Sequence, residues 1–260
     1  MIQSFYPFSI FKNTVHVLAV DDDWRILDLI QAYLESFHLY IVDRASRTAD
    51  AIKVIEKSNS RYHVCVMDRG LGDVEGNEFY LMDRYRQKMP IIVITGRKDS
   101  EKAFECGEHG GKKVVAKGEN NFLEKVLTSI NEFALKSIVC PGCHESASPF
   151  LNRCYDTLVG KKPFSVEALA QCLHMSERSL RIALNKNTRI NPKYSICLFH
   201  LYSKLFECVE ACASKGIGID LKKYNSERLA DPDYAKNYIR FCKYFLRKRT
   251  IFDNLLQMSK

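Results

Sequence analysis

Five apolar runs of strand length alternate with five amphipathic stretches over the first 135 residues of the chain. This alternation limits the fold more than any other feature of the sequence. The strand-like runs cover 15–20, 39–42, 64–67, 91–95 and 114–116, and the apolar spacing of helices covers 24–37, 48–57, 79–85, 102–109 and 122–135. Such alternation predicts a parallel sheet with helices on both faces. Because ligands on these sheets bind at the carboxyl ends of the strands, a site is expected there.

Polar residues follow four of the five predicted strands. Asp21 and Asp22 follow the first strand, Asp68 the third, Thr95 ends the fourth and Lys117 follows the fifth. Crowded carboxylates repel each other and need a cation to stay ionised, and Mg²⁺ accepts such oxygen ligands. Lysine and threonine can bind phosphoryl oxygens. Any one acid could be a solvated loop residue, but the four strand ends together predict an acyl-phosphate site with Asp68 as nucleophile.

These residues lie in motifs that resemble those of a response-regulator receiver domain over residues 14–131. The acidic motif is Ala19-Val20-Asp21-Asp22-Asp23, the phosphoacceptor motif runs from Met67-Asp68 to Gly76, and the switch motif is Ile94-Thr95-Gly96. The resemblance implies a flavodoxin-like α/β fold, a doubly wound five-stranded parallel sheet. It also implies a sensor histidine kinase as partner, phosphorylation of Asp68, and a face for homodimerisation. The resemblance further implies that Mg²⁺ is bound by Asp21, Asp22, Asp68 and the backbone carbonyl of Gly70. It implies that Thr95 and Lys117 bind the phosphoryl group and act as switch residues.

Two positions depart from the receiver pattern. Gly118 follows Lys117 where the family usually has proline, and Val114 stands where the family usually has an aromatic switch residue. The first departure affects the loop that holds Lys117. The second puts the usual aromatic relay in doubt but leaves phosphorylation possible.

The second half of the chain is much more basic than the first. Residues 1–131 contain 18 Lys/Arg and 19 Asp/Glu, a net charge of −1, whereas residues 132–260 contain 21 and 12, a net charge of +9. This asymmetry fits a polyanionic partner such as double-stranded DNA for the second half, although a solvated basic surface would give the same count.

Two short helices are predicted in this half, over 164–173 with Ser165 as N-cap and over 177–187. Helices joined by such a tight turn indicate an all-α helix-turn-helix domain, although short helix pairs are common in other all-α domains. Hydrogen-bond donors on the second helix suit phosphates and base edges in a major groove. The candidate DNA-binding residues are Ser176, Arg178, Ser179, Arg181 and Lys186.

Residues 164–205 resemble the first helix-turn-helix of the AraC/XylS family of transcription factors. The matching stretch includes Leu169-Ala170, Met175 to Arg181, Asn191-Pro192 and a long linking helix over 194–213, on which the family's usual arginine is His200. The region of the second helix-turn-helix, 219–254, matches poorly. Its basic residues could contact only the DNA backbone, or could form a solvated helix face.

The sequence therefore predicts a receiver domain over 1–135, a linker over 136–162 and an AraC-like helical DNA-binding domain over 163–260. The predicted function is that of a cytoplasmic response regulator of a two-component system, a phosphoprotein that regulates transcription. The alternative is a phosphorylation-regulated signalling adaptor whose helical output domain binds a protein; exposure of Arg178 and Arg181 would favour DNA, and their burial would favour the adaptor. No enzymatic activity is expected, because no acid–base or nucleophile constellation follows residue 132.

Two further features of the sequence concern metal binding and membrane contact. Cys140-Pro141-Gly142-Cys143-His144 contains a CxxC, but zinc needs about four ligands and Cys154 is the only further candidate nearby. A linker turn without metal is the favoured interpretation. No apolar run approaches the length that crosses a bilayer, so no membrane contact is expected.

Overall fold

The computed structural model describes residues 14–57, 62–72, 77–96, 100–140, 149–188, 191–217, 231–232 and 236. Contacts divide these residues into two compact units. The sheet unit holds the described residues up to 140 together with 206–217, and the helical unit holds 149–205.

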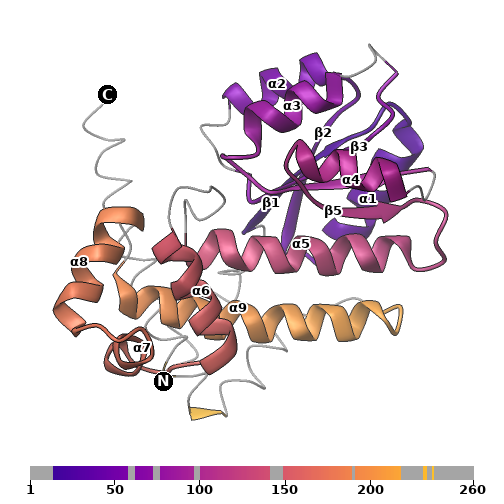
Figure 1. The fold of residues 1–260 in the computed structure, drawn as a ribbon. Helices are drawn as coiled ribbons and strands as arrows, with labels where there is room; N and C mark the ends of the chain where they lie inside the picture. Colours follow the sequence, from indigo (N-terminus) through magenta and orange to yellow (C-terminus); the bar gives the residue numbers. More distant parts are fainter. Residues whose placement is uncertain are drawn as a thin grey trace, which may run out of the picture. The chain divides into compact units, whose positions relative to one another are not determined.

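The sheet unit follows the predicted alternation of strands and helices (Figure 1). Its strands are β1 (Val15–Val20), β2 (Tyr40–Ala45), β3 (Val64–Asp68), β4 (Ile91–Thr95) and β5 (Gly111–Ala116). Its helices are α1 (Trp24–Glu35), α2 (Thr48–Lys57), α3 (Asn77–Tyr85), α4 (Ser100–Glu108) and α5 (Phe122–Val139).

All neighbouring strands of the sheet pair in parallel, in the order β2-β1-β3-β4-β5. The chain moves from β1 outward to β2 and then returns to the other side of β1 to form β3. The strand order therefore reverses between β1 and β3, and ligands of doubly wound sheets bind at this reversal, outside the carboxyl ends of the strands. The predicted five-stranded parallel sheet is confirmed.

Apolar side chains fix this arrangement on both faces of the sheet. One buried cluster joins strand residues such as Leu18, Met67 and Val93 to residues of α2, α3 and α4. Helices α1 and α5 contact each other and also contact β1 and β3, respectively. Strands β3 and β4 are buried along their whole length, as expected for strands covered on both faces.

The helical unit contains α6 (Pro149–Lys161), α7 (Val166–Cys172), α8 (Glu177–Thr188) and the first part of α9 (Pro192–Ala213). Its core includes Leu158 of α6, Leu169 of α7, and Leu180 and Leu184 of α8. Ser165 caps α7 as predicted: its hydroxyl accepts a hydrogen bond from the backbone N–H of Ala168 at 3.0 Å.

The region expected to be a linker, 136–162, is largely helical. Helix α5 continues to Val139, and α6 occupies Pro149–Lys161. Leu151, Cys154 and Leu158 of α6 are buried at helical spacing, so this helix belongs to the core of its unit instead of connecting two units. A short helix over 150–158 is compatible with the sequence, and Pro149 starts α6, where its missing N–H costs nothing.

Three predictions fall largely outside the described residues. They concern Gly76 of the phosphoacceptor motif, Cys143 and His144 of the CxxC motif, and almost all of the second helix-turn-helix region over 219–254. Cys140 and Cys154 are described, and both are buried. Among the helices that the structure describes, none is long and apolar enough to cross a membrane.

Candidate functional site

The site is built at the reversal of strand order, from the residues that end β1 and β3. Val20 pairs with Met67 in the sheet, so Asp21 and Asp68, the next residues along each chain segment, lie side by side. Both carboxylates are buried, with exposed fractions of 0% and 5%. The fold thus brings two acids of the predicted cluster to one point.

Lys117 joins the two carboxylates. Its Nζ lies 2.7 Å from Oδ2 of Asp21 and 2.8 Å from Oδ1 of Asp68. The backbone N–H of Lys117 also donates to the carbonyl oxygen of Thr95 at 2.8 Å, which fixes the start of the loop after β5 beside the end of β4. The structure therefore brings the side chains of Asp21, Asp68 and Lys117 together, with the backbone of Thr95 next to that of Lys117.

Burial and pairing set the charge states of this cluster. Burial raises the pKa of Asp21 above its usual value, and the ion pair with Lys117 only partly offsets this effect. Burial alone would lower the pKa of Lys117, but hydrogen bonds and charge attraction from Asp21 and Asp68 outweigh burial and raise it. Lys117 thus stays protonated, and any further positive charge that enters the site favours the ionised form of Asp21.

The same acids offer a set of metal ligands. Among the described residues, carboxylate oxygens of Asp21, Asp22 and Asp68 lie within 4.8 Å of one another. Asp22 is exposed, so the cluster opens to solvent on that side. Two buried carboxylates and one exposed carboxylate fit a hard divalent cation that keeps some of its water, as Mg²⁺ does.

The loop after β3 supports this cluster through its glycines. The N–H of Gly70 donates to Oδ2 of Asp68 at 2.9 Å, and the N–H of Gly72 donates to Oδ2 of Asp22 at 3.2 Å. A Cβ atom at position 72 would lie only 2.9 Å from that Asp22 oxygen, so glycine permits the close approach. The sequence analysis did not identify Gly72, because its role depends on a contact across 50 residues.

Asp23, the third acid of the acidic motif, has a different role. Its carboxylate accepts from the backbone N–H of Arg25 at 3.0 Å and caps the N-terminus of α1. It also pairs with the guanidinium of Arg25 at 2.8 Å. Asp23 thus starts the helix that follows the site, and it is not one of the three clustered acids.

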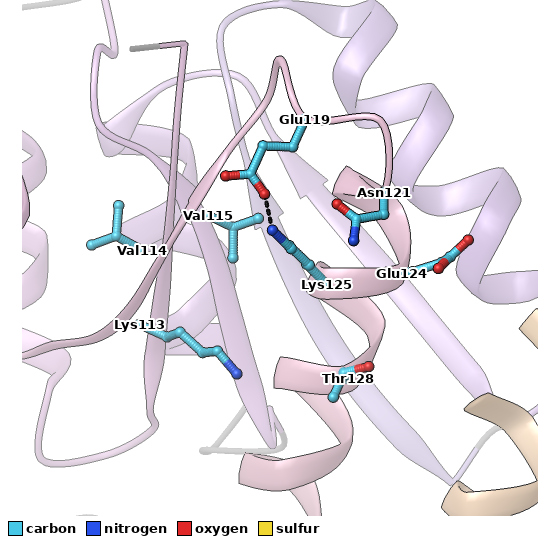
Figure 2. A pocket seen from close by; sticks show the side chains of 8 residues that line it. All are labelled: Lys113, Val114, Val115, Glu119, Asn121, Glu124, Lys125 and Thr128. Atoms are coloured by element: carbon cyan, nitrogen blue, oxygen red, sulfur yellow. Dashed lines mark hydrogen bonds and ion pairs between the residues drawn. The ribbon is translucent and has the colours of Figure 1, made fainter. Parts of the chain in front are cut away.

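A pocket of about 440 Å³ lies between β5, the loop that follows it and α5 (Figure 2). Val114, the residue at the expected aromatic switch position, is half-exposed and lines this pocket. Glu119 and Lys125 form an ion pair across it.

The predicted DNA-binding residues lie on and next to α8, and they differ in exposure and in their side-chain partners. Ser176 caps α8 by accepting from the N–H of Ser179 at 3.1 Å, and the two serine hydroxyls lie 2.9 Å apart. Arg178 and Lys186 are exposed. Arg181 is partly buried and pairs with Glu177 at 3.1 Å, so it is less available than Arg178.

Sequence analysis also missed Ile182, which is 60% exposed on α8. It follows Arg178 by four residues and precedes Asn185 by three, so the three residues share one exposed side of the helix. The helical spacing of these residues is visible in the sequence, but an apolar side chain carries no hydrogen-bond donor that would indicate contact with DNA.

The comparisons with known proteins agree with this geometry. Residues 17–127 match the family model described as the response regulator receiver domain. The heme response regulator HssR of Staphylococcus aureus (strain bovine RF122 / ET3-1) is 32% identical over 96 residues, which are 36% of this chain and 42% of HssR. HssR of S. aureus strain JH9 matches with the same identity and coverage. The chain thus spans less than half the length of the curated relatives it matches.

Solved receiver domains align with less than half of the chain. A CheY-like response regulator receiver domain protein from Methanospirillum hungatei JF-1 is 27% identical, with a TM-score of 0.40, and the alignment covers 46% of this chain and 96% of that one. A receiver domain protein from Clostridium thermocellum is 20% identical, with a TM-score of 0.41 and coverage of 46% and 94%.

The family match and the clustered acids coincide on the same segment of the chain. Asp21, Asp68, Thr95 and Lys117 all lie within the matched residues, at the carboxyl ends of β1, β3, β4 and β5. Residues 17–127 are therefore a response regulator receiver domain.

Proposed function

We propose that the chain is a response regulator of a two-component system, in which a histidine kinase phosphorylates Asp68 and the helical unit controls transcription by binding DNA. The observation that carries the proposal is the Lys117 ammonium, which bridges the buried carboxylates of Asp21 and Asp68. The similarity of the receiver segment to HssR, a heme response regulator, supports a signalling role over an enzymatic one.

Phosphorylation would use the side chains in the following way. An oxygen of Asp68 attacks the phosphorus atom of the kinase phosphohistidine, a P–O bond forms and the P–N bond breaks. When bound by Asp21, Asp22, Asp68 and the carbonyl of Gly70, Mg²⁺ supplies positive charge to the phosphoryl oxygens. Lys117 and the hydroxyl of Thr95 then bind the phosphoryl oxygens, so the end of β4 and the loop after β5 respond to the new charge.

The DNA-binding part of the proposal rests on α7 and α8. By the resemblance of residues 164–205 to the first helix-turn-helix of AraC/XylS proteins, α8 would enter the major groove. Arg178, Ile182 and Asn185 would face the bases: arginine suits guanine edges, asparagine suits adenine, and an apolar side chain suits the thymine methyl group. The charge of +9 over residues 132–260 favours a polyanionic partner.

One observation favours the alternative, a signalling adaptor whose helical unit binds a protein. Arg181 is held by Glu177, and Ile182 presents an apolar side chain to solvent, which a protein surface would also cover. Arg178 is exposed, however, and in this respect the helix meets the requirement for DNA binding.

Retardation of labelled genomic fragments tests the two functions. The wild-type chain should retard a subset of fragments at low salt, and a small phosphodonor with Mg²⁺ should change its affinity, whereas Asp68→Asn should not respond to the phosphodonor. Arg178→Ala should weaken specific binding by about 1–3 kcal/mol. The matched control Arg153→Ala, in α6, should leave specific binding unchanged. Absence of retardation at low salt would reject DNA binding and leave the adaptor.

A further inference from the structure

Arg69 lies between Asp68, the last residue of β3, and Gly70, the two residues of this segment that the proposed metal site uses. Its backbone N–H donates to the carbonyl of Ile94 at 3.0 Å, so the loop begins against the end of β4. The next N–H, that of Gly70, donates back to Asp68 at 2.9 Å. The backbone of Arg69 therefore links the end of β4 to the segment that carries Asp68 and Gly70.

The side chain of Arg69 is anchored to two helices of the sheet unit. Its Nη2 lies 2.7 Å from Oε2 of Glu105 in α4. Its guanidinium carbon lies 5.8 Å from the ring centroid of Phe79 in α3. Phe79 also has His109 as a neighbour, just beyond α4, whose ring is stacked on it at 4.4 Å between centroids. The guanidinium thus has a charged partner, Glu105, and an aromatic partner, Phe79, and it also hydrogen-bonds to Cys106 of α4.

This anchor differs from the ion pairs on the surface of the sheet unit. The side chains of Arg69 and Glu105 are 20% and 44% exposed, whereas those of Arg84 and its partner Glu56 are 43% and 52% exposed. Exposed pairs contribute little, because water screens them and two mobile side chains must be ordered. The Arg84 guanidinium also has aromatic neighbours, at 5.8 Å from the ring centroid of Tyr80 and 5.5 Å from that of Tyr85. The two arginines therefore differ in burial, and the more buried guanidinium of Arg69 is less screened by water.

We propose that Arg69 is a positioning residue, which holds the loop bearing Asp68 and Gly70 in its metal-binding arrangement through the ion pair with Glu105. This inference rests on the proposed Mg²⁺ site. Ligands that are held by a supporting shell bind metal more tightly than ligands left free to move. Glu105, which is not among the clustered acids, therefore contributes to Mg²⁺ affinity through Arg69.

Mg²⁺ binding should in turn strengthen the ion pair between Arg69 and Glu105. Coupling between two equilibria is reciprocal, so a bound ion that orders the loop also stabilises the contact with α4. Amide hydrogen exchange of α4 should therefore slow when Mg²⁺ binds. Removal of either partner of the ion pair should abolish this slowing.

Titration of the full chain with Mg²⁺ alone tests the proposal. Calorimetry measures the affinity, and fluorescence of Trp24, the only tryptophan and the residue after the acidic motif, reports it independently. Arg69→Gln and Glu105→Gln should each weaken Mg²⁺ binding by about tenfold, the lower end of effects seen for supporting residues. Arg69→Lys, which keeps the charge, should recover part of the affinity. The matched control Arg84→Gln removes an exposed ion pair and should bind Mg²⁺ like the wild type.

Hydrogen exchange of the metal-free chain distinguishes failure of this inference from failure of the proposed function. Amides of residues 69–72 and of α4 should exchange faster in Arg69→Gln and Glu105→Gln than in Arg84→Gln. Unchanged exchange would show that the ion pair between Arg69 and Glu105 does not hold the loop. Faster exchange with unchanged Mg²⁺ affinity would show that holding the loop does not position the metal ligands. A wild-type chain that binds no Mg²⁺ would instead overturn the proposed metal site and, with it, the positioning of its ligands.

Discussion

Asp21 is a buried acid whose ionisation the fold opposes. It is fully buried, its pKa is raised by that burial, and Lys117 is shared with Asp68. Such a residue is expected to favour function at a cost in stability, because its negative charge is useful only when a cation or phosphoryl group is present.

Asp21→Asn should therefore stabilise the metal-free chain by about 1 kcal/mol. Asparagine can still accept the hydrogen bond that Asp21 receives from the N–H of Asp23, but it removes a buried negative charge. Urea unfolding at pH 7 in the presence of EDTA measures the change. Asp22→Asn, at the exposed acid, should change stability less, and a destabilised Asp21→Asn would contradict the electrostatic interpretation.

His63 is the residue that should make the sheet unit sensitive to mild acid. Burial, aided by the neighbouring His16, lowers the pKa of His63 to about 4. Its Nδ1 accepts from the N–H of His16 at 3.0 Å, and its carbonyl accepts from the hydroxyl of Ser137 at 3.0 Å. Protonation would remove the acceptor at Nδ1 and place a charge in a desolvated position.

The direction of the pH effect follows from the lowered pKa. Between pH 6.5 and pH 4 the unfolded chain binds a proton at His63 and the folded chain does not, so stability falls as pH falls. Between pH 6.5 and pH 5 the loss should be about 2 kcal/mol. Urea unfolding at pH 6.5 and pH 5 measures it. His63→Gln should reduce this dependence, and the matched control His109→Gln should keep it; equal slopes in all three proteins would reject the assignment.

At the scale of elements, the caps that start helices are local and depend on single side chains. The hydroxyl of Ser165 accepts from the N–H of Ala168 and so begins α7. Loss of an N-cap costs about 1 kcal/mol. We therefore expect the amides of α7 to exchange roughly fivefold faster with solvent in Ser165→Ala.

Thr157→Ala is the control for this effect. Thr157 is a hydroxyl residue inside α6 of the same unit, where its Oγ1 donates to the carbonyl of Arg153 at 2.7 Å and caps no helix. Its removal should leave exchange of α7 within the range of ordinary surface changes. Equal acceleration in the two variants would show that the Ser165 effect does not arise from capping.

Most elements of the sheet unit could be predicted because apolar periodicity directly reflects burial. The runs over 15–20 and 91–95 coincide with β1 and β4, and the periodic stretch over 48–57 coincides with α2. Strand β5 begins three residues earlier than expected, at Gly111, because it is an edge strand and its first residues carry polar, exposed side chains. Apolar pattern alone cannot find such residues.

Contacts between distant segments could not be predicted from the sequence. Ligands of parallel sheets bind at the carboxyl ends of the strands, and this rule depends only on the order of elements. It could therefore predict that Asp21, Asp68, Thr95 and Lys117 lie at one edge of the sheet. The ion pair between Arg69 and Glu105 and the hydrogen bond between Gly72 and Asp22 depend on how loops approach helices, and no spacing in the sequence encodes them.

At the scale of the whole molecule, the chain contains a receiver domain and a helical unit of different charge. The receiver segment accounts for residues 17–127, and its site geometry supports the chemistry proposed for Asp68. The helical unit supplies α8 with Arg178, Ile182 and Asn185 exposed. The account therefore depends first on whether the receiver accepts a phosphoryl group, because every proposed response of the second half follows from that event.

Intact mass spectrometry after incubation with a small phosphodonor tests this claim most directly. The wild-type chain should gain the mass of one phosphoryl group when Mg²⁺ is present and should gain none when EDTA removes the metal. Asp68→Asn should gain no phosphoryl group in either condition. The control Ser129→Ala, which removes a hydroxyl from α5 outside the site, should behave like the wild type. Phosphorylation of Asp68→Asn, or of the wild type without Mg²⁺, would contradict the account.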